Sequence, residues 1–175
     1  MPLYQFKEFK PSIGEKVFIA PSADVIGDVE LSDESNIWFR TVVRGDVNKI
    51  TIGRGTNIQD LCMLHVVEEL PLIIGDGVSV GHSVTLHACT VEGNCLIGMG
   101  STILDGAVIG RNSLVAAGSL VTPGKKFPPG SFIAGSPARV KRELNEEELL
   151  QYGEHYNSYR KYSEQFLDPS TFKEI

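Results

Sequence analysis

Cysteine, tryptophan and histidine are scarce in this sequence of 175 residues, which contains three, one and four of them. The cysteines, Cys62, Cys89 and Cys95, form no C-x-x-C pair. Their odd number and apolar neighbours predict small buried side chains rather than a disulfide framework or a set of metal ligands. Acidic residues outnumber basic ones by 22 to 16. This balance argues against nucleic acid as a partner, because nucleic-acid-binding proteins usually present a basic face.

Long apolar runs are also missing. No segment approaches the roughly 20 apolar residues that a membrane-spanning helix needs. The N-terminal segment MPLYQFKEFKPSIG lacks the apolar centre and the small-residue cleavage site of a signal peptide. We therefore expect a protein that binds no membrane and is located in the cytoplasm.

Aliphatic residues recur every six positions through most of the chain, in four blocks that differ in phase. The positions are Ile19, Val25, Leu31, Ile37 and Val43, then Ile52, Ile58 and Leu64, then Ile74, Val80 and Leu86, then Val91, Ile97, Ile103, Ile109, Val115 and Val121. A period of six fits neither an α-helix nor a long alternating strand. An ordinary β-sandwich would instead show turns every 8–12 residues.

Short strands that turn a corner every six residues explain this spacing. The aliphatic side chain points inward, and a following glycine permits the tight backbone at the corner. Three hexads form one triangular coil of roughly 18 residues, so residues 11–135 predict six or seven coils. This is the pattern of a parallel β-helix, whose stacked coils bury a continuous aliphatic column.

The repeat ends at Lys125–Gly130, because its two prolines and its glycine cannot continue a central strand. Asn145 and the three glutamates after it predict the start of an α-helix that runs to about Leu167. We therefore predict a β-helix domain over residues 1–140 and a C-terminal helix within residues 141–175. This helix is expected to pack on the β-helix or on a neighbouring subunit.

Two histidines, His65 and His87, fall at equivalent positions on adjacent coils. Leu64 and Ile74 are ten residues apart, so four extra residues must bulge out between positions 66 and 72. The 22 residues between the two histidines then equal one coil plus the bulge. Stacked strands lie about 4.8 Å apart. Two imidazoles at that spacing can bind one metal ion.

His82 is expected on the preceding flat face, about one triangle edge away from His65 and His87. At that distance it cannot share their metal within one chain. A threefold trimer with parallel coil axes would bring His82 of one chain opposite His65 and His87 of the next. Three imidazoles with an open fourth position are typical of a catalytic zinc site. From the residues alone, unrelated surface or core histidines stay an equal alternative.

Three short motifs occur in a fixed order: Arg44-Gly45-Asp46, Asn57-Ile58-Gln59-Asp60, and His65 followed by Gly81-His82-Ser83-x-x-x-His87. With the hexads, they resemble the gamma-class carbonic anhydrases and their bacterial carbonic-anhydrase-like relatives over about residues 10–170. The resemblance implies an all-β, left-handed parallel β-helix with a C-terminal α-helix. It also implies a homotrimer with metal sites between its subunits. The left hand of the coil comes from the resemblance alone.

The resemblance implies that His65, His82 and His87 are the metal ligands. Zn²⁺ is the implied cofactor, although three imidazoles also accept Fe²⁺ or Co²⁺. Gln59 would hydrogen-bond the metal-bound hydroxide, and Asn57 would order the water near it.

Five further positions match the family pattern. Arg44 and Asp46 would form an ion pair at the subunit interface, with Asp60 in the same polar network. Tyr159 matches a tyrosine at the rim of the site. Glu68 matches the glutamate that carries the proton to solvent, with Glu69 as its alternative. The loop around Glu68 is shorter than in the best-known family members, which predicts low turnover.

The implied activity is the reversible hydration of carbon dioxide to bicarbonate. A coenzyme A-dependent hexapeptide acyltransferase is the main alternative, because it shares the turn Gly135-Ser136-Pro137-Ala138-Arg139. Such an enzyme needs one histidine base, so a set of three histidines favours the anhydrase interpretation. Thioester hydrolysis at the same metal, or a non-catalytic metal-binding trimeric scaffold, also stays open.

Overall fold

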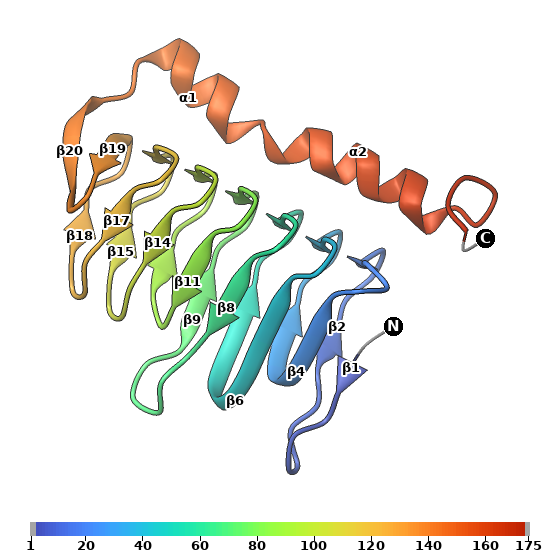
Figure 1. The fold of residues 1–175 in the computed structure, drawn as a ribbon. Coiled ribbons are helices and arrows are strands. Elements are labelled where there is room, and N and C mark those ends of the chain that lie inside the picture. The colour runs from blue at the N-terminus through green and yellow to red at the C-terminus, as the bar shows by residue number, and fades with distance from the viewer. Residues whose placement is uncertain (1–2, 174–175) are drawn as a thin grey trace.

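Each hexad of the sequence forms a strand of a few residues, and its aliphatic side chain points into the coil. The computed structural model describes residues 3–173 and shows a parallel β-helix of about seven turns, with a helical segment along one side (Figure 1). This confirms the predicted fold class. The hand of the coil stays a prediction.

The first face of the coil carries strands that stack in parallel. They are β1 (Leu3–Tyr4), the first part of β4 (Asp24–Leu31), the first part of β6 (Val42–Ile52), β8 (Met63–His65), β11 (Thr85–His87), β14 (Thr102–Ile103) and β17 (Leu120–Val121). β4 and β6 continue around the corner onto the second face, so the two faces form one twelve-stranded sheet.

The other two faces repeat the pattern. The second face consists of β2 (Ser12–Ile13), the ends of β4 and β6, β9 (Leu72–Ile74), β12 (Thr90–Val91), β15 (Val108–Ile109) and β18 (Lys126–Phe127). The third face consists of β3 (Phe18–Ile19), β5 (Asn36–Ile37), β7 (Asn57–Ile58), β10 (Ser79–Val80), β13 (Leu96–Ile97), β16 (Leu114–Val115), β19 (Ser131–Gly135) and the antiparallel β20 (Ala138–Glu143). The predicted boundary at residue 140 falls within β20, and the division into two domains stays a prediction.

The aliphatic column inside the coil is the core of the molecule. On the first face, Leu64, Leu86 and Ile103 stack on one another across β8, β11 and β14, and all three are fully buried. The three cysteines are also buried and unpaired. Burial raises the pKa of each cysteine thiol to about 12. Their prediction as small core side chains is therefore confirmed.

Between β8 and β9 the chain bulges out of the coil, as the spacing of Leu64 and Ile74 predicted. An antiparallel bridge between Val67 and Leu70 closes this turn. The extra residues leave the coil without disturbing the stacking of β11 on β8.

The predicted C-terminal helix is confirmed as one helical segment of 22 residues, which a two-residue turn divides into α1 and α2. Asn145 caps α1 (Glu146–Gly153) through a reciprocal capping box with Glu148, as expected. The helix then breaks at Glu154 and His155, and α2 (Tyr156–Leu167) follows. The interruption itself was not predicted, because neither the hexads nor the N-cap marks its position. No helix within residues 3–173 has the length and apolar character to cross a membrane.

α2 lies along the third face and contacts β3, β5 and β7. Phe166 packs against the rings of Phe18 and Trp38, at centroid distances of 5.3 and 5.1 Å. Outward-facing polar residues of this face, including Asn57 and Ser79, are thereby buried.

Candidate metal centre

His65 and His87 end two neighbouring strands of the first face. β8 and β11 pair in parallel with His87 directly opposite His65, which is the register that the sequence predicted. The ring centroids are 5.1 Å apart, close to the expected strand spacing. Nδ1 of His65 lies 3.1 Å from Nε2 of His87, so the two imidazoles face each other.

A carboxylate holds the outer nitrogen of each of these imidazoles. Asp46 Oδ1 is 3.0 Å from Nε2 of His65, and Asp105 Oδ1 is 2.5 Å from Nδ1 of His87. A carboxylate at one ring nitrogen fixes the tautomer and leaves the other nitrogen with a free lone pair. Two lone pairs then face each other, an arrangement that a cation between them stabilises.

The spacing of these nitrogens fits a metal ion. With zinc–nitrogen bonds of 2.0–2.1 Å and tetrahedral geometry, two bound nitrogens stand roughly 3.3 Å apart. The facing nitrogens of His65 and His87 are 3.1 Å apart. Two imidazoles, each held by a carboxylate, therefore fit two of the positions around a zinc ion.

His82 shows the same pairing with a carboxylate at a different corner of the coil. It lies in the turn between β10 and β11, not on a flat face as expected. Its Nδ1 is 2.9 Å from Asp60 Oδ2, in the corresponding turn one coil earlier. Its Nε2 lies 3.5 Å from the hydroxyl of Tyr159 on α2. Gly81 is needed before it, because a Cβ there would come within 2.8 Å of the Met99 nitrogen.

The three histidines do not meet within one chain. Among residues 3–173, no group of three or more His, Cys, Asp or Glu side chains is placed to hold a metal ion. His65 and His87 converge without a third histidine, and His82 faces a separate cavity.

Gln59, His82 and Tyr159 line one cavity of about 320 Å³. Asn57 is fully buried beside it, and its Oδ1 accepts a hydrogen bond from Nε2 of Gln59 at 3.0 Å. Burial, and then the nearby charge of Asp60, raise the pKa of Tyr159. The structure thus gathers four residues that the sequence assigned to one site, although they come from β7, the residue directly after it, a turn and α2.

Arg44 and Asp46 form the predicted ion pair within the chain. Burial pushes the pKa of Asp46 upward, but hydrogen bonds with His65 and Arg44 outweigh it and hold this pKa below its usual value. Asp46 therefore stays charged and links Arg44 to His65. Its role at a subunit interface stays a prediction.

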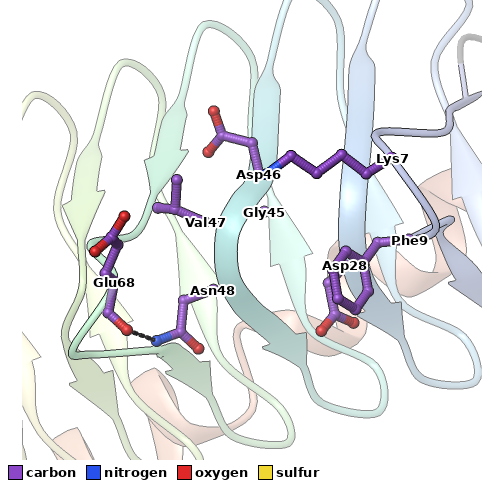
Figure 2. Close-up of a pocket in the computed structure, with 8 residues that line it drawn as sticks. All are labelled: Lys7, Phe9, Asp28, Gly45, Asp46, Val47, Asn48 and Glu68. Carbon is purple, nitrogen blue, oxygen red and sulfur yellow. Dashed lines mark hydrogen bonds between the residues drawn. The ribbon is translucent and has the colours of Figure 1, made fainter.

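Glu68 is exposed on the turn between β8 and β9. It lines a hollow of about 360 Å³ together with Asp46, Val47 and Asn48 (Figure 2). Nδ2 of Asn48 donates to the backbone oxygen of Glu68 at 2.8 Å, which anchors the turn. Because Asp46 also contacts His65, this hollow adjoins the histidine pair. Glu69 is exposed on the same turn.

Asp105 is a functional candidate that was not predicted from the sequence. It follows His87 by 18 residues, one coil, so the hexad phase could have identified it. The same reasoning connects Asp60 with His82, which are separated by 22 residues, one coil plus the bulge.

Replacing Asp105 by asparagine is expected to weaken metal binding roughly 10- to 100-fold, because His87 loses the carboxylate that fixes its tautomer. Competition with a chromophoric chelator measures this change. Glu164→Gln, a neutralised carboxylate at an exposed position of α2, is the matched control. Equal metal affinity in the Asp105→Asn variant and the wild type would show that the carboxylate does not support His87.

Sequence similarity to known proteins covers most of this chain, including the hexad repeats. Residues 88–123 match the family model described as "Bacterial transferase hexapeptide (six repeats)". The "Carbonic anhydrase" of Geobacillus kaustophilus is 49% identical over 85% of this chain and 82% of its own length. The "Gamma carbonic anhydrase 2, mitochondrial" of Arabidopsis thaliana is 46% identical over 85% of this chain.

The chain belongs to the gamma carbonic anhydrase family. It spans 56% of the length of the Arabidopsis relative. A solved "hexapeptide transferase family protein" from Anaplasma phagocytophilum has a TM-score of 0.89 and 42% identity, covering 93% of this chain and 96% of that one. Proteins similar to this chain are thus named for two activities, carbonic anhydrase and transferase. The geometry of the site has to distinguish between these two activities.

Proposed function

We propose that the protein is a metal-dependent carbonic anhydrase that interconverts carbon dioxide and bicarbonate. The observation that carries the proposal is the facing pair of imidazole nitrogens at His65 and His87, with Asp46 and Asp105 on their outer nitrogens. His82 has an equivalent carboxylate partner in Asp60. Three histidines that each have a carboxylate partner fit a metal site with three imidazole ligands. They fit the active site of an acyltransferase less well, because such an enzyme needs only one histidine base.

A homotrimer supplies the missing ligand of each site. His82 of one subunit would approach His65 and His87 of the next, giving three equivalent sites around the threefold axis. Exposed apolar side chains lie near both groups of ligands, His82 on one side and the His65–His87 pair on the other. Leu61 and Met99 lie at the His82 corner and are each 57% exposed. Met63 is 42% exposed on the strand that ends at His65. Such residues are typical of surfaces that another subunit covers.

The side chains around the metal have separate tasks. A zinc ion held by three imidazoles lowers the pKa of bound water to about 7 and thereby supplies a nucleophile at neutral pH. Asp46, Asp60 and Asp105 hold the imidazoles in the tautomer that donates to the metal. Gln59 is 4% exposed and lines the cavity beside His82, where its amide can orient a reactant.

The cavity at His82 suits a small apolar substrate. Leu96, Ile97 and Met99 contribute to its wall. An apolar wall with a few polar groups is typical of sites that bind small molecules in one orientation. Carbon dioxide would therefore bind against the wall while Gln59 faces the reacting atoms.

Metal analysis and a carbon dioxide hydration assay on the same preparation test the proposal. We expect one Zn²⁺, Fe²⁺ or Co²⁺ per subunit, and hydration that a chelator removes and the metal restores. A protein that binds no metal would contradict the site. A metal-loaded protein that does not hydrate carbon dioxide would contradict the activity and favour a scaffold. Release of coenzyme A from acetyl-coenzyme A by the same preparation would favour an acyltransferase or a thioesterase.

Glu68 is the proposed acceptor of the proton that leaves the site. Glu68→Gln is expected to lower kcat in dilute buffer by about 100-fold, the low end of what positioned proton transfer contributes. Because proton release follows the chemical step, kcat/KM should change little, and concentrated imidazole buffer should restore kcat. Glu69→Gln, on the same turn, is the matched variant. A loss of kcat in Glu69→Gln alone would assign the role to Glu69.

A further inference from the structure

A chain of buried hydrogen bonds connects Gln59 with the break in the C-terminal helix. Nε2 of Gln59 donates to Oδ1 of Asn57 at 3.0 Å, and Nδ2 of Asn57 donates to Oγ of Ser79 at 2.8 Å. Oγ of Ser79 lies 3.1 Å from Nδ1 of His155, which is 76 residues away in the sequence. Asn57, Gln59 and Ser79 are at most 4% exposed, so each of their polar atoms needs a partner.

The break between α1 and α2 places His155 in this chain of bonds. His155 occupies the position that would cap α2, but its side chain makes no capping hydrogen bond. Serine or asparagine would be the usual residue for a cap. The imidazole is directed instead to Ser79 on β10, and it lines the same cavity as Gln59 and His82.

The chain of bonds can run in two opposite directions, and the neighbours favour one. Nδ2 of Asn57 also lies 3.5 Å from the backbone oxygen of Val78, where an amide oxygen would be repelled. Asn57 therefore donates to Ser79, and the Ser79 hydroxyl keeps one hydrogen to donate. Among residues 3–173, its other partner is Nδ1 of His155. His155 must then be neutral, with its proton on Nε2.

The direction of the bonds decides what Gln59 presents to the cavity. With Nε2 turned toward Asn57, the amide oxygen of Gln59 is left for a molecule in the cavity. If His155 carried its proton on Nδ1, every bond could reverse, and Gln59 would present its NH₂ group instead. Burial lowers the pKa of His155, which agrees with a neutral ring.

We propose that His155 is a positioning residue which, through Ser79 and Asn57, fixes the orientation of the Gln59 amide beside His82. The effect on catalysis rests on the proposed function, since it requires that Gln59 faces the reactants. The hydrogen-bond chain itself depends only on the fold, so it can be tested in protein that holds no metal.

The first test is the tautomer of His155 in metal-free protein, measured by long-range ¹H–¹⁵N NMR. We expect the proton on Nε2, and we expect the Nδ1 resonance to shift in Ser79→Ala. A proton on Nδ1, or a resonance that Ser79→Ala leaves in place, would overturn the proposal. This result is independent of any carbon dioxide hydration, so failure of the proposed function does not affect it.

The second test compares His155→Leu with His155→Asn, whose side-chain oxygen can accept a hydrogen bond near the position of Nδ1. In His155→Leu, the side-chain amide of Asn57 should exchange its hydrogens faster, and kcat should fall about tenfold with the metal content unchanged. His155→Asn should restore both. Gln151→Leu, at an exposed position of α1, is the control. Wild-type exchange at Asn57 in His155→Leu would overturn the proposal, and if this variant does not fold, the tautomer measurement still decides.

Discussion

Replacing His82 by alanine is expected to remove the metal and to lower carbon dioxide hydration by far more than 100-fold. Loss of a residue that merely supports a ligand costs roughly 10- to 100-fold, and loss of a ligand costs more. The β-helix should keep its stability, because His82 lies in a turn with 42% of its side chain exposed. Metal analysis, hydration rate and thermal unfolding of the same sample measure the three effects.

Co-expression of two inactive variants tests whether the site is shared between subunits. One variant carries His82→Ala, and the other carries His65→Ala together with His87→Ala. In each mixed trimer, one interface joins an intact His65–His87 pair to an intact His82. Random assembly from equal amounts should therefore restore about a quarter of the wild-type sites.

A site within one chain would give no recovery at all, since neither variant contains all three ligands. Mixing the two purified proteins without subunit exchange is the control and should stay inactive. Recovery of metal and activity only after co-expression would link the catalytic site to the assembly. Metal bound at the wild-type level by His82→Ala alone would contradict the role of His82.

Leu86→Ala is expected to have the largest effect on stability. Leu86 is fully buried and stacks between Leu64 and Ile103 on the adjacent coils. Truncating a buried leucine removes apolar contacts and leaves a cavity, which lowers the free energy of unfolding by about 2–5 kcal/mol. Because β11 also carries His87, the variant should bind the metal more weakly as well.

Urea unfolding at one fixed subunit concentration measures this loss, so that any contribution of subunit association is the same for every variant. Thr85→Ala is the matched control, because Thr85 precedes Leu86 on the same strand and is only partly buried. Its effect should stay within about 0.5 kcal/mol, as for most surface substitutions. If both variants lost the same free energy of unfolding, the inward-facing side chain of Leu86 would not be what stabilises β11.

Most of the fold could be predicted from the sequence because a coil converts sequence separation directly into position. Each residue has its neighbours one coil before and one coil after it, so the hexad phase predicts both burial and stacking. The distance from Leu64 to Ile74 revealed the bulge, and the bulge placed His87 opposite His65. The same counting could have identified Asp105.

Only the tertiary structure decided how the C-terminal helices meet the coil. The N-cap of this segment did not show where the segment bends or which face it covers, because no repeat relates it to the hexads. α2 packs on the third face, which buries Asn57 and Ser79, and the break before it brings His155 to Ser79. Contacts across 76 residues depend on packing between unlike elements, and a local pattern in the sequence does not encode them.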